Sequence, residues 1–341
     1  MPLALGADLF SQYPCSRDAE ARKILAERFH REPTVKFGAF LVHYAATVVP
    51  IAITLAVCSI HPSVLTYALA AIVIGFAQNS LGVLMHEGAH YFFHPRRRVN
   101  DLLADVLVCW PIFNTVAGYR APHFEHHRYS GSAGDPYLEL YSGWASKRDL
   151  LLTLLRDASS LSAIAKFTSR VSAAASNRDR SSSPGTTLGL LAVQGIIFAI
   201  YAAATGRWWA YFVLWALPLM TFGQVLSRIR AAVEHMPRPG DPEVSRSTAP
   251  GWIEYLLVAP HGYSFHFEHH VAPSIPYYRL AAAHRSLCDR GFAFTDRELV
   301  SGYVTTFASL WLSLASPLER RTALTWDEGG GRAASMCRPL S

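Results

Sequence analysis

Long apolar runs alternate with polar segments along the chain. Four of these runs contain no Asp, Glu, Lys or Arg, and each approaches the roughly 20 residues with which a helix crosses about 30 Å of hydrocarbon. They are residues 37–60, 64–85, 187–205 and 208–226. Only residues 61–63 separate the first two runs and residues 206–207 the last two, so each pair predicts a tight hairpin. The pattern predicts an all-α membrane protein with four transmembrane helices in two hairpins.

The distribution of Lys and Arg predicts how these hairpins are oriented. Six such residues precede Phe37, twelve lie between the hairpins and twelve follow the second, whereas the two turns contain none and one. By the positive-inside rule, the polar segments lie on the cytoplasmic side. We therefore expect both termini and a helical cap that carries the functional site to be cytoplasmic. The excess of Arg over Lys, 27 to 4, is typical of a GC-rich bacterial genome and favours the bacterial inner membrane.

Composition supports a membrane protein and gives no reason to expect a nucleic-acid partner. A chain of 341 residues that is 51% hydrophobic is poorly explained by two ordinary soluble domains. The net charge of +6 requires no nucleic acid, because basic residues beside a bilayer meet anionic lipid headgroups. The membrane itself is therefore the partner that the charge predicts.

The polar segments divide the chain further. We expect a cytoplasmic leader over residues 1–36 with an amphipathic helix at 19–29, a membrane domain over 37–316, and a disordered tail over 317–341. The apolar stretch at 101–119 is interrupted by Pro111 and rich in aromatic residues. It favours an interfacial or re-entrant segment over a fifth span.

Nine of the fifteen histidines are clustered, and the spacing within the clusters is helical. They are His86 and His90 in HEGAH, His123, His126 and His127 in HFEHH, the single His235, and His266, His269 and His270 in a second HFEHH. Positions i, i+3 and i+4 share one face of a helix, so each cluster presents its imidazoles in one direction. A zinc ion takes about four ligands, so nine imidazoles fit two metal ions better than one. Imidazole suits iron, copper and zinc alike, and the spacing does not choose among them.

Carboxylates that accept the second N–H of a ligand imidazole fix its orientation and tautomer. Glu87 and Glu234 adjoin predicted ligands, and Asp135 follows the second cluster in the string GDPYL. We expect these three residues to support the metal ligands rather than to bind metal.

The ordered histidine clusters and their surroundings resemble the membrane fatty acid desaturase and hydroxylase superfamily, most closely the bacterial acyl-lipid desaturases. The resemblance extends over roughly residues 35–290 and includes RxRxxxEH at 228–235, GDPYL after the second cluster, and HHVAPSIPYYRLAAAH in the third. It implies two non-haem iron ions bound by the nine histidines, O2 as co-substrate and a lipid acyl substrate. It also implies electrons from a separate donor, such as ferredoxin or a b-type cytochrome with its reductase.

One position departs from the superfamily pattern. Relatives often have Asn four residues before the histidine that matches His235, where it contacts iron directly or through water, but this chain has Ala231. His261, five residues before the third cluster, is a possible tenth ligand in its place. A water molecule is the alternative.

Several other functions remain open from the sequence. A hydroxylase or ketolase of the same superfamily, acting on a fatty acyl chain, a carotenoid or an alkane, differs from a desaturase only in the fate of the oxidised carbon; the stretch HHVAPSIPYY favours the desaturase. HEGAH is also a literal HExxH, the motif of zinc proteases with Glu87 as general base. A protease of that kind leaves both HFEHH clusters unexplained. We expect the isolated His30, His43, His61 and His284 to be interfacial or pH-sensing residues, and His94 to have a structural role.

Overall fold

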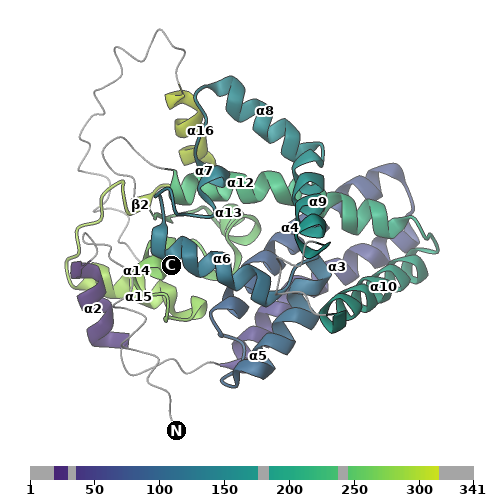
Figure 1. Cartoon of the computed structure of the whole chain (residues 1–341), viewed down its shortest axis with the longest axis horizontal. Helices are drawn as coiled ribbons and strands as arrows, with labels where there is room; N and C mark the ends of the chain where they lie inside the picture. The colour runs from purple at the N-terminus through teal and green to yellow at the C-terminus, as the bar shows by residue number, and fades with distance from the viewer. Residues whose placement is uncertain (1–18, 30–35, 176–183, 237–244, 315–341) are drawn as a thin grey trace. The chain divides into compact units, whose positions relative to one another are not determined.

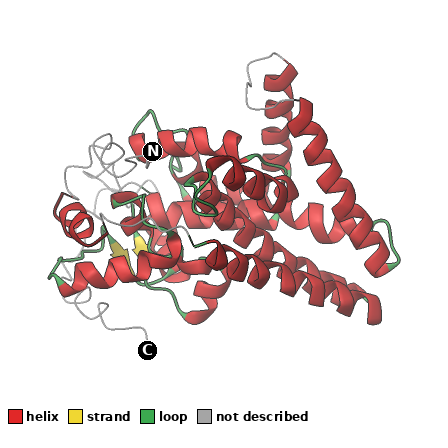
Figure 2. Cartoon of the chain, turned by 90° about the horizontal axis from the view of Figure 1, so that it is seen from below, coloured by secondary structure: helices red, strands yellow, loops and turns green. Residues whose placement is uncertain are grey.

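The computed structural model describes residues 19–29, 36–175, 184–236 and 245–314, and its ordered backbone is almost entirely helical (Figures 1 and 2). The predicted tail at 317–341 and most of the predicted leader lie outside these residues. The chain forms two compact units. We call Val35–Ala121 with Leu151–Arg228 the span unit, and Met1–Thr34, Pro122–Leu150 and Ile229–Ser341 the histidine unit. Helices α6, α8 and α12 each pass from one unit into the other.

Four helical segments are long and apolar enough to cross a membrane, as the sequence predicts. They are α3 (Phe37–Ile60), α4 (Val64–Ala89), α10 (Pro184–Thr205) and the segment Phe212–His235. This last segment consists of a π-helical turn η4 (Phe212–Ala216), α11 (Leu217–Met220) and α12 (Phe222–His235). The predicted spans at 37–60, 64–85 and 187–205 lie within α3, α4 and α10, respectively.

Two helices continue beyond the predicted spans at 64–85 and 208–226. Helix α4 continues through Glu87, and α12 continues through Arg228. Each charge has a buried partner, because Glu87 contacts the imidazole of His86 and Arg228 is paired with Asp157. A charged residue that is paired inside the protein does not have to mark the point where a helix leaves the membrane.

The apolar stretch between the hairpins forms a broken segment, with two helical arms that meet at 90°. The first arm comprises α5 (Arg97–Ala104), the π-helical η2 (Asp105–Cys109) and the 3-10 turn η3 (Trp110–Ile112), and the second is α6 (Val116–Tyr129). At the break Phe113 is left-handed, with φ 56°. This geometry is that of a broken span or a re-entrant loop. That residues 101–119 are interfacial or re-entrant rather than a fifth span stays a prediction.

Side chains from two spans satisfy the backbone at this break. Gln194 Nε2 of α10 donates to the carbonyl oxygens of Trp110 at 2.6 Å and Pro111 at 2.9 Å. Trp215 Nε1 donates to the same Pro111 oxygen at 2.9 Å. At Gly189 of α10, an added Cβ would lie 2.5 Å from the Trp110 ring, so the close approach requires glycine. Side chains thereby bond backbone carbonyl groups at the break inside the protein, as a non-aqueous environment requires.

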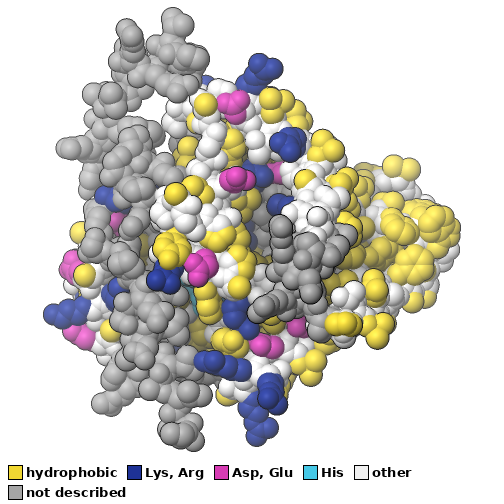
Figure 3. Space-filling view, in the orientation of Figure 1, with side chains coloured by type: hydrophobic (Ala, Val, Ile, Leu, Met, Phe, Trp, Pro, Cys, Tyr) yellow, Lys and Arg dark blue, Asp and Glu magenta, His cyan; other side chains and the backbone are white. Residues whose placement is uncertain are grey.

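The span unit exposes many large apolar side chains. On the face shown in Figure 3, hydrophobic side chains predominate over α3 and α10. The exposed residues of these two helices include Val42, Val49, Ile53, Ile60, Leu188, Leu191, Ile196 and Ile200. Such a surface is stable against lipid rather than water. The unit also contains α9 (Leu161–Ala175) and most of α8 (Lys147–Ala158).

The histidine unit is built from short helices and one small sheet. Its further elements are α2 (Ala19–Phe29), α7 (Leu138–Tyr141), α13 (Trp252–Leu257), η5 (Pro260–Gly262), α14 (His266–Val271), α15 (Tyr277–Asp289), α16 (Tyr303–Ser313), β1 (Ser247–Thr248) and β2 (Leu299–Val300). The strands pair in parallel, with Ser247 opposite Leu299. Helix α2 occupies the position predicted for the amphipathic helix, and its Leu25 and Phe29 are buried.

Candidate metal centre

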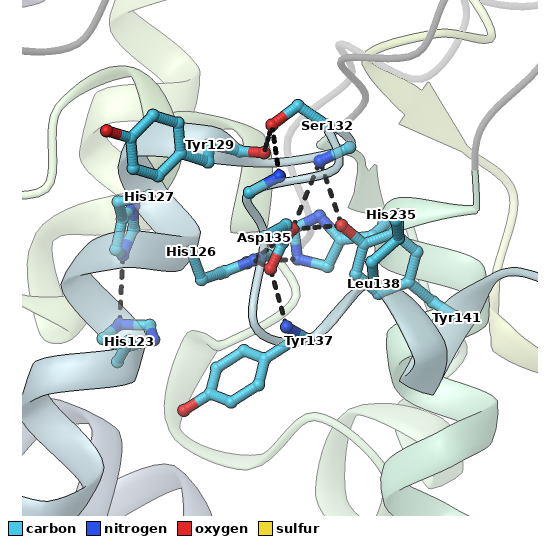
Figure 4. Close-up of polar contacts among 12 residues, drawn as sticks. His123, His126, His127, Tyr129, Ser132, Asp135, Tyr137, Leu138, Tyr141 and His235 are labelled. Carbon is cyan, nitrogen blue, oxygen red and sulfur yellow. Dashed lines mark hydrogen bonds and ion pairs between the residues drawn. The ribbon is translucent and has the colours of Figure 1, made fainter.

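The part of α6 that belongs to the histidine unit carries three of the predicted metal ligands. His123, His126 and His127 are buried and lie on one side of the helix, as the i, i+3, i+4 spacing requires. The Nε2 atoms of His123 and His127 are 3.0 Å apart (Figure 4). His126 points its Nε2 toward a different neighbour, the Nε2 of His235, at 3.3 Å.

Helices α12 and α14 bring the other four clustered histidines of this unit to α6. His235 is the last residue of α12, and its Nε2 lies 2.7 Å from that of His266 in α14. His269 places its Nε2 3.1 Å from that of His127. The imidazoles therefore gather in two groups whose ligand atoms lie within 4.8 Å of one another. The first is His126, His235, His266 and His270, and the second contains His123, His127 and His269.

The first group has the chemistry of a metal site. A neutral imidazole offers one N–H donor and one lone pair, so several converging Nε2 atoms are poorly satisfied by hydrogen bonds to one another. The Nε2 of His270 is buried and has no hydrogen-bond partner among the described residues. Burial, followed by the charges of the neighbouring imidazoles, holds the pKa of His270 well below its ordinary value. The ring is therefore neutral at physiological pH, which is the form that binds a metal ion.

Asp135 fixes the orientation of His126 in this group (Figure 4). Its Oδ2 lies 2.9 Å from His126 Nδ1, and it also accepts hydrogen bonds from the Tyr141 hydroxyl and the Gly131 backbone N–H. Burial raises the pKa of Asp135, but the hydrogen bond and charge of His126, with the bonds from Tyr141 and Tyr137, lower this pKa below its usual value overall. The carboxylate thus holds a proton on His126 Nδ1 and leaves Nε2 directed at the group.

Glu268, inside the third cluster, connects its helix to the surrounding fold. The Ser247 hydroxyl of β1 donates to the buried Glu268 carboxylate, and His284 Nδ1 of α15 lies 2.5 Å from its Oε1. Ser247 Oγ also accepts the backbone N–H of Phe267 at 3.0 Å. Helix α14 is therefore held from two sides. His284, which the sequence suggested to be an isolated interfacial residue, contributes to this support.

Glu234 and Arg246 stabilise the end of α12 at His235. Glu234 accepts a hydrogen bond from the Tyr303 hydroxyl at 2.8 Å, and its Oε2 lies 4.0 Å from His266 Nε2. The buried guanidinium of Arg246 donates to the carbonyl oxygens of Val233 at 3.0 Å and Met236 at 2.6 Å. A cation suits the last carbonyls of a helix, where the dipole leaves partial negative charge.

The HEGAH histidines belong to the span unit, at the end of the second apolar helix. His86 lies in the last turn of α4, and His90 is the residue at its C-terminal cap. Their ring centroids are 4.8 Å apart, and His86 Nδ1 lies 2.6 Å from Glu87 Oε1. Glu87 thus contacts the imidazole that precedes it, and its role in supporting a metal ligand stays a prediction. That His86 and His90 bind metal together with the other seven histidines stays a prediction.

His261 lies in neither histidine group. It occupies the left-handed region in η5, with φ 64°, and its ring centroid is 6.4 Å from that of Tyr277. Ala231, the residue that replaces the superfamily's Asn, is buried in α12 one turn before His235. That His261 is a tenth ligand also stays a prediction.

Comparisons with known proteins agree with the histidine pattern. Residues 62–295, which contain all nine clustered histidines, match the family model described as fatty acid desaturase. Dihydrorhizobitoxine desaturase of Bradyrhizobium elkanii is 26% identical over 246 residues, which cover 67% of this chain and 69% of the relative. Beta-carotene ketolase of Paracoccus sp. (strain PC1) is 24% identical over 243 residues, which cover 64% of this chain and 79% of the relative.

Proposed function

Because the chain belongs to the fatty acid desaturase family, we propose that it is an oxidoreductase that introduces a C=C double bond into a lipid acyl chain at a pair of histidine-bound iron ions. The observation that carries the proposal is the convergence of seven buried or nearly buried imidazoles from α6, α12 and α14 into two groups within one unit. Family membership supports iron as the metal, since the imidazoles alone would suit copper or zinc equally well.

The reaction requires O2 and two external electrons. Two hydrogens leave adjacent carbons of the acyl chain, O2 is reduced to two molecules of water, and a separate donor supplies two electrons accompanied by two protons. Bound iron would supply the activation of O2 for cleavage of the unreactive C–H bonds. We propose a ferredoxin or a b-type cytochrome with its reductase as the donor, docking on the cytoplasmic side of the bacterial inner membrane.

The protein's own residues would bind the metal ions, orient the ligand imidazoles and keep bulk water away from them. His126, His235, His266 and His270 would hold one iron. His123, His127 and His269 would hold the other, with His86 and His90 as the ligands predicted from the sequence. The Asp135 carboxylate keeps the His126 proton on Nδ1, and the burial of the imidazoles excludes bulk water from the metal ions. The acyl chain would enter from the lipid that surrounds the exposed apolar faces of α3 and α10.

We expect purified protein to contain about two iron ions per chain, since seven to nine imidazoles exceed the needs of one ion. Elemental analysis after chelator-free purification measures this directly. Treatment with an iron chelator should remove the metal and the activity together, and restoring ferrous iron should recover both. A single zinc ion per chain would contradict the proposal and would instead favour the protease reading of HEGAH.

A second candidate is oxygen insertion, because one of the relatives is a ketolase. Lipid extracts from cells that express the chain separate the two reactions by mass. We expect products that have lost two hydrogens, whereas a hydroxylase would add one oxygen and a ketolase would add one oxygen and remove two hydrogens. Cells that express the His126→Ala variant provide the background. Oxygenated lipids or carotenoids without any new alkene would replace the desaturase assignment by the second candidate.

A further inference from the structure

Tyr141 lies at the centre of the contacts that surround His126. It is the last residue of α7 and is completely buried. Its ring centroid is 5.2 Å from that of His235 and 6.3 Å from that of His126. The residue therefore touches two members of one histidine group without offering a ligand atom to it.

The hydroxyl of Tyr141 has two defined hydrogen bonds. It donates to Asp135 Oδ2 and accepts the backbone N–H of Gly131 at 3.0 Å (Figure 4). Burial, together with the neighbouring Asp135 carboxylate, raises the pKa of Tyr141 well above its ordinary value. The phenol consequently stays protonated and remains a donor throughout the physiological range of pH.

The same Asp135 oxygen lies 2.9 Å from His126 Nδ1, so the carboxylate joins the phenol to the imidazole. The backbone N–H of Tyr137 donates to the other oxygen, Oδ1, at 2.8 Å. Donors on both oxygens limit rotation of the carboxylate. Loss of the Tyr141 hydroxyl would leave Oδ2 with only the 3.2 Å bond from the Gly131 backbone N–H beside its contact with His126, and the direction in which Asp135 holds His126 would be less well defined.

Resting on the proposed function, we infer that Tyr141 is a positioning residue that fixes the Asp135 carboxylate and, through it, aims His126 Nε2 at the metal. The ring and the hydroxyl of Tyr141 have separate roles: the ring packs beside His235, while the hydroxyl fixes the direction of the Asp135 carboxylate. Removing the hydroxyl alone should weaken metal binding without removing the packing.

Tyr141→Phe tests this in the purified full-length protein, stripped of metal and titrated with Co2+ against a competing chelator. Loss of a residue that orients a metal ligand typically weakens binding about 10–100-fold, and we expect about tenfold for Tyr141→Phe and more for Asp135→Asn. The visible absorption of bound Co2+ reports the geometry independently of catalysis. Because Tyr141 acts through Asp135, the double variant should bind no more weakly than Asp135→Asn alone.

Tyr129→Phe is the matched control. Tyr129 is an exposed residue at the end of α6, and in Figure 4 its hydroxyl points away from Asp135 and His126. This variant should bind Co2+ like the unmodified protein. Thermal unfolding of the metal-free variants identifies general damage, and Tyr141→Leu, which also lacks the hydroxyl, is the second variant if Tyr141→Phe does not fold.

Three results would overturn the inference. Unchanged Co2+ affinity and spectrum in Tyr141→Phe would show that the hydroxyl has no positioning role. Additive losses in the double variant would show that Tyr141 acts independently of Asp135. An unmodified protein that binds neither Co2+ nor iron would refute the proposed function itself, and is distinguished from the first two results by the behaviour of the unmodified chain.

Discussion

The His126→Ala variant is expected to lose one metal ion and essentially all turnover. His126 is one of four histidines whose ligand atoms converge, and its Nε2 lies 3.3 Å from that of His235. Its removal takes away one ligand and also leaves the buried Asp135 without its imidazole partner. Iron content should fall from about two ions per chain to about one. Turnover should fall by at least about 100-fold, because loss of a residue that only orients a ligand already costs about 10–100-fold.

His61→Ala provides the comparison for this variant. His61 is exposed in the turn that follows α3 and belongs to neither histidine group. Its replacement should change neither iron content nor the yield of modified lipid. If His126→Ala retained both irons and normal turnover, the assignment of the α6 histidines as ligands would be wrong, whatever the effect of the control.

Asp157→Asn is expected to destabilise the span unit strongly. The Asp157 carboxylate of α8 is paired with the Arg228 guanidinium of α12, with Arg228 Nη2 3.2 Å from Asp157 Oδ1, and both residues are buried. The amide leaves the guanidinium without a compensating charge, which costs about 3–5 kcal/mol at buried sites. A large decrease in the thermal unfolding temperature of the detergent-solubilised protein would reveal this loss.

Two further variants show whether burial causes the effect. Glu27→Gln breaks the pair between Glu27 and Arg290, whose side chains are 48% and 55% exposed, and exposed pairs contribute only about 0–1 kcal/mol. Replacing both Asp157 and Arg228 by Leu and Met should restore much of the stability, since apolar residues of similar size often substitute well for a buried pair. Equal losses in Asp157→Asn and Glu27→Gln would argue against the explanation from burial.

The main features of the fold follow from periodicity in the sequence. The four apolar runs predicted four helices because hydrocarbon thickness sets their minimum length. The HFEHH clusters could be read as shared helix faces because their spacing is three and four residues. Both clusters lie on helices, although the second begins only at His266, the first residue of α14.

Features that depend on tertiary partners could not be found in this way. The pairing of Arg228 with Asp157 could not be predicted, because the two residues are 71 positions apart in the sequence. Tyr141 and Arg246 match no metal-binding motif, and their roles arise from contacts that only the folded chain creates. Asp135 could be suggested as a supporting residue because it follows the second cluster closely. The support from His284 could not be predicted, because the Glu268 carboxylate that it contacts is sixteen residues away.

The glutamine in the middle of α10 has a consequence for the path of the chain. With α10 across the bilayer, Gln194 lies near the midplane, and so do the Trp110 and Pro111 oxygens that it bonds. Its amide and the Trp215 indole take the place of water molecules there. The polypeptide can therefore turn by 90° at this depth without leaving these two carbonyl groups exposed to hydrocarbon.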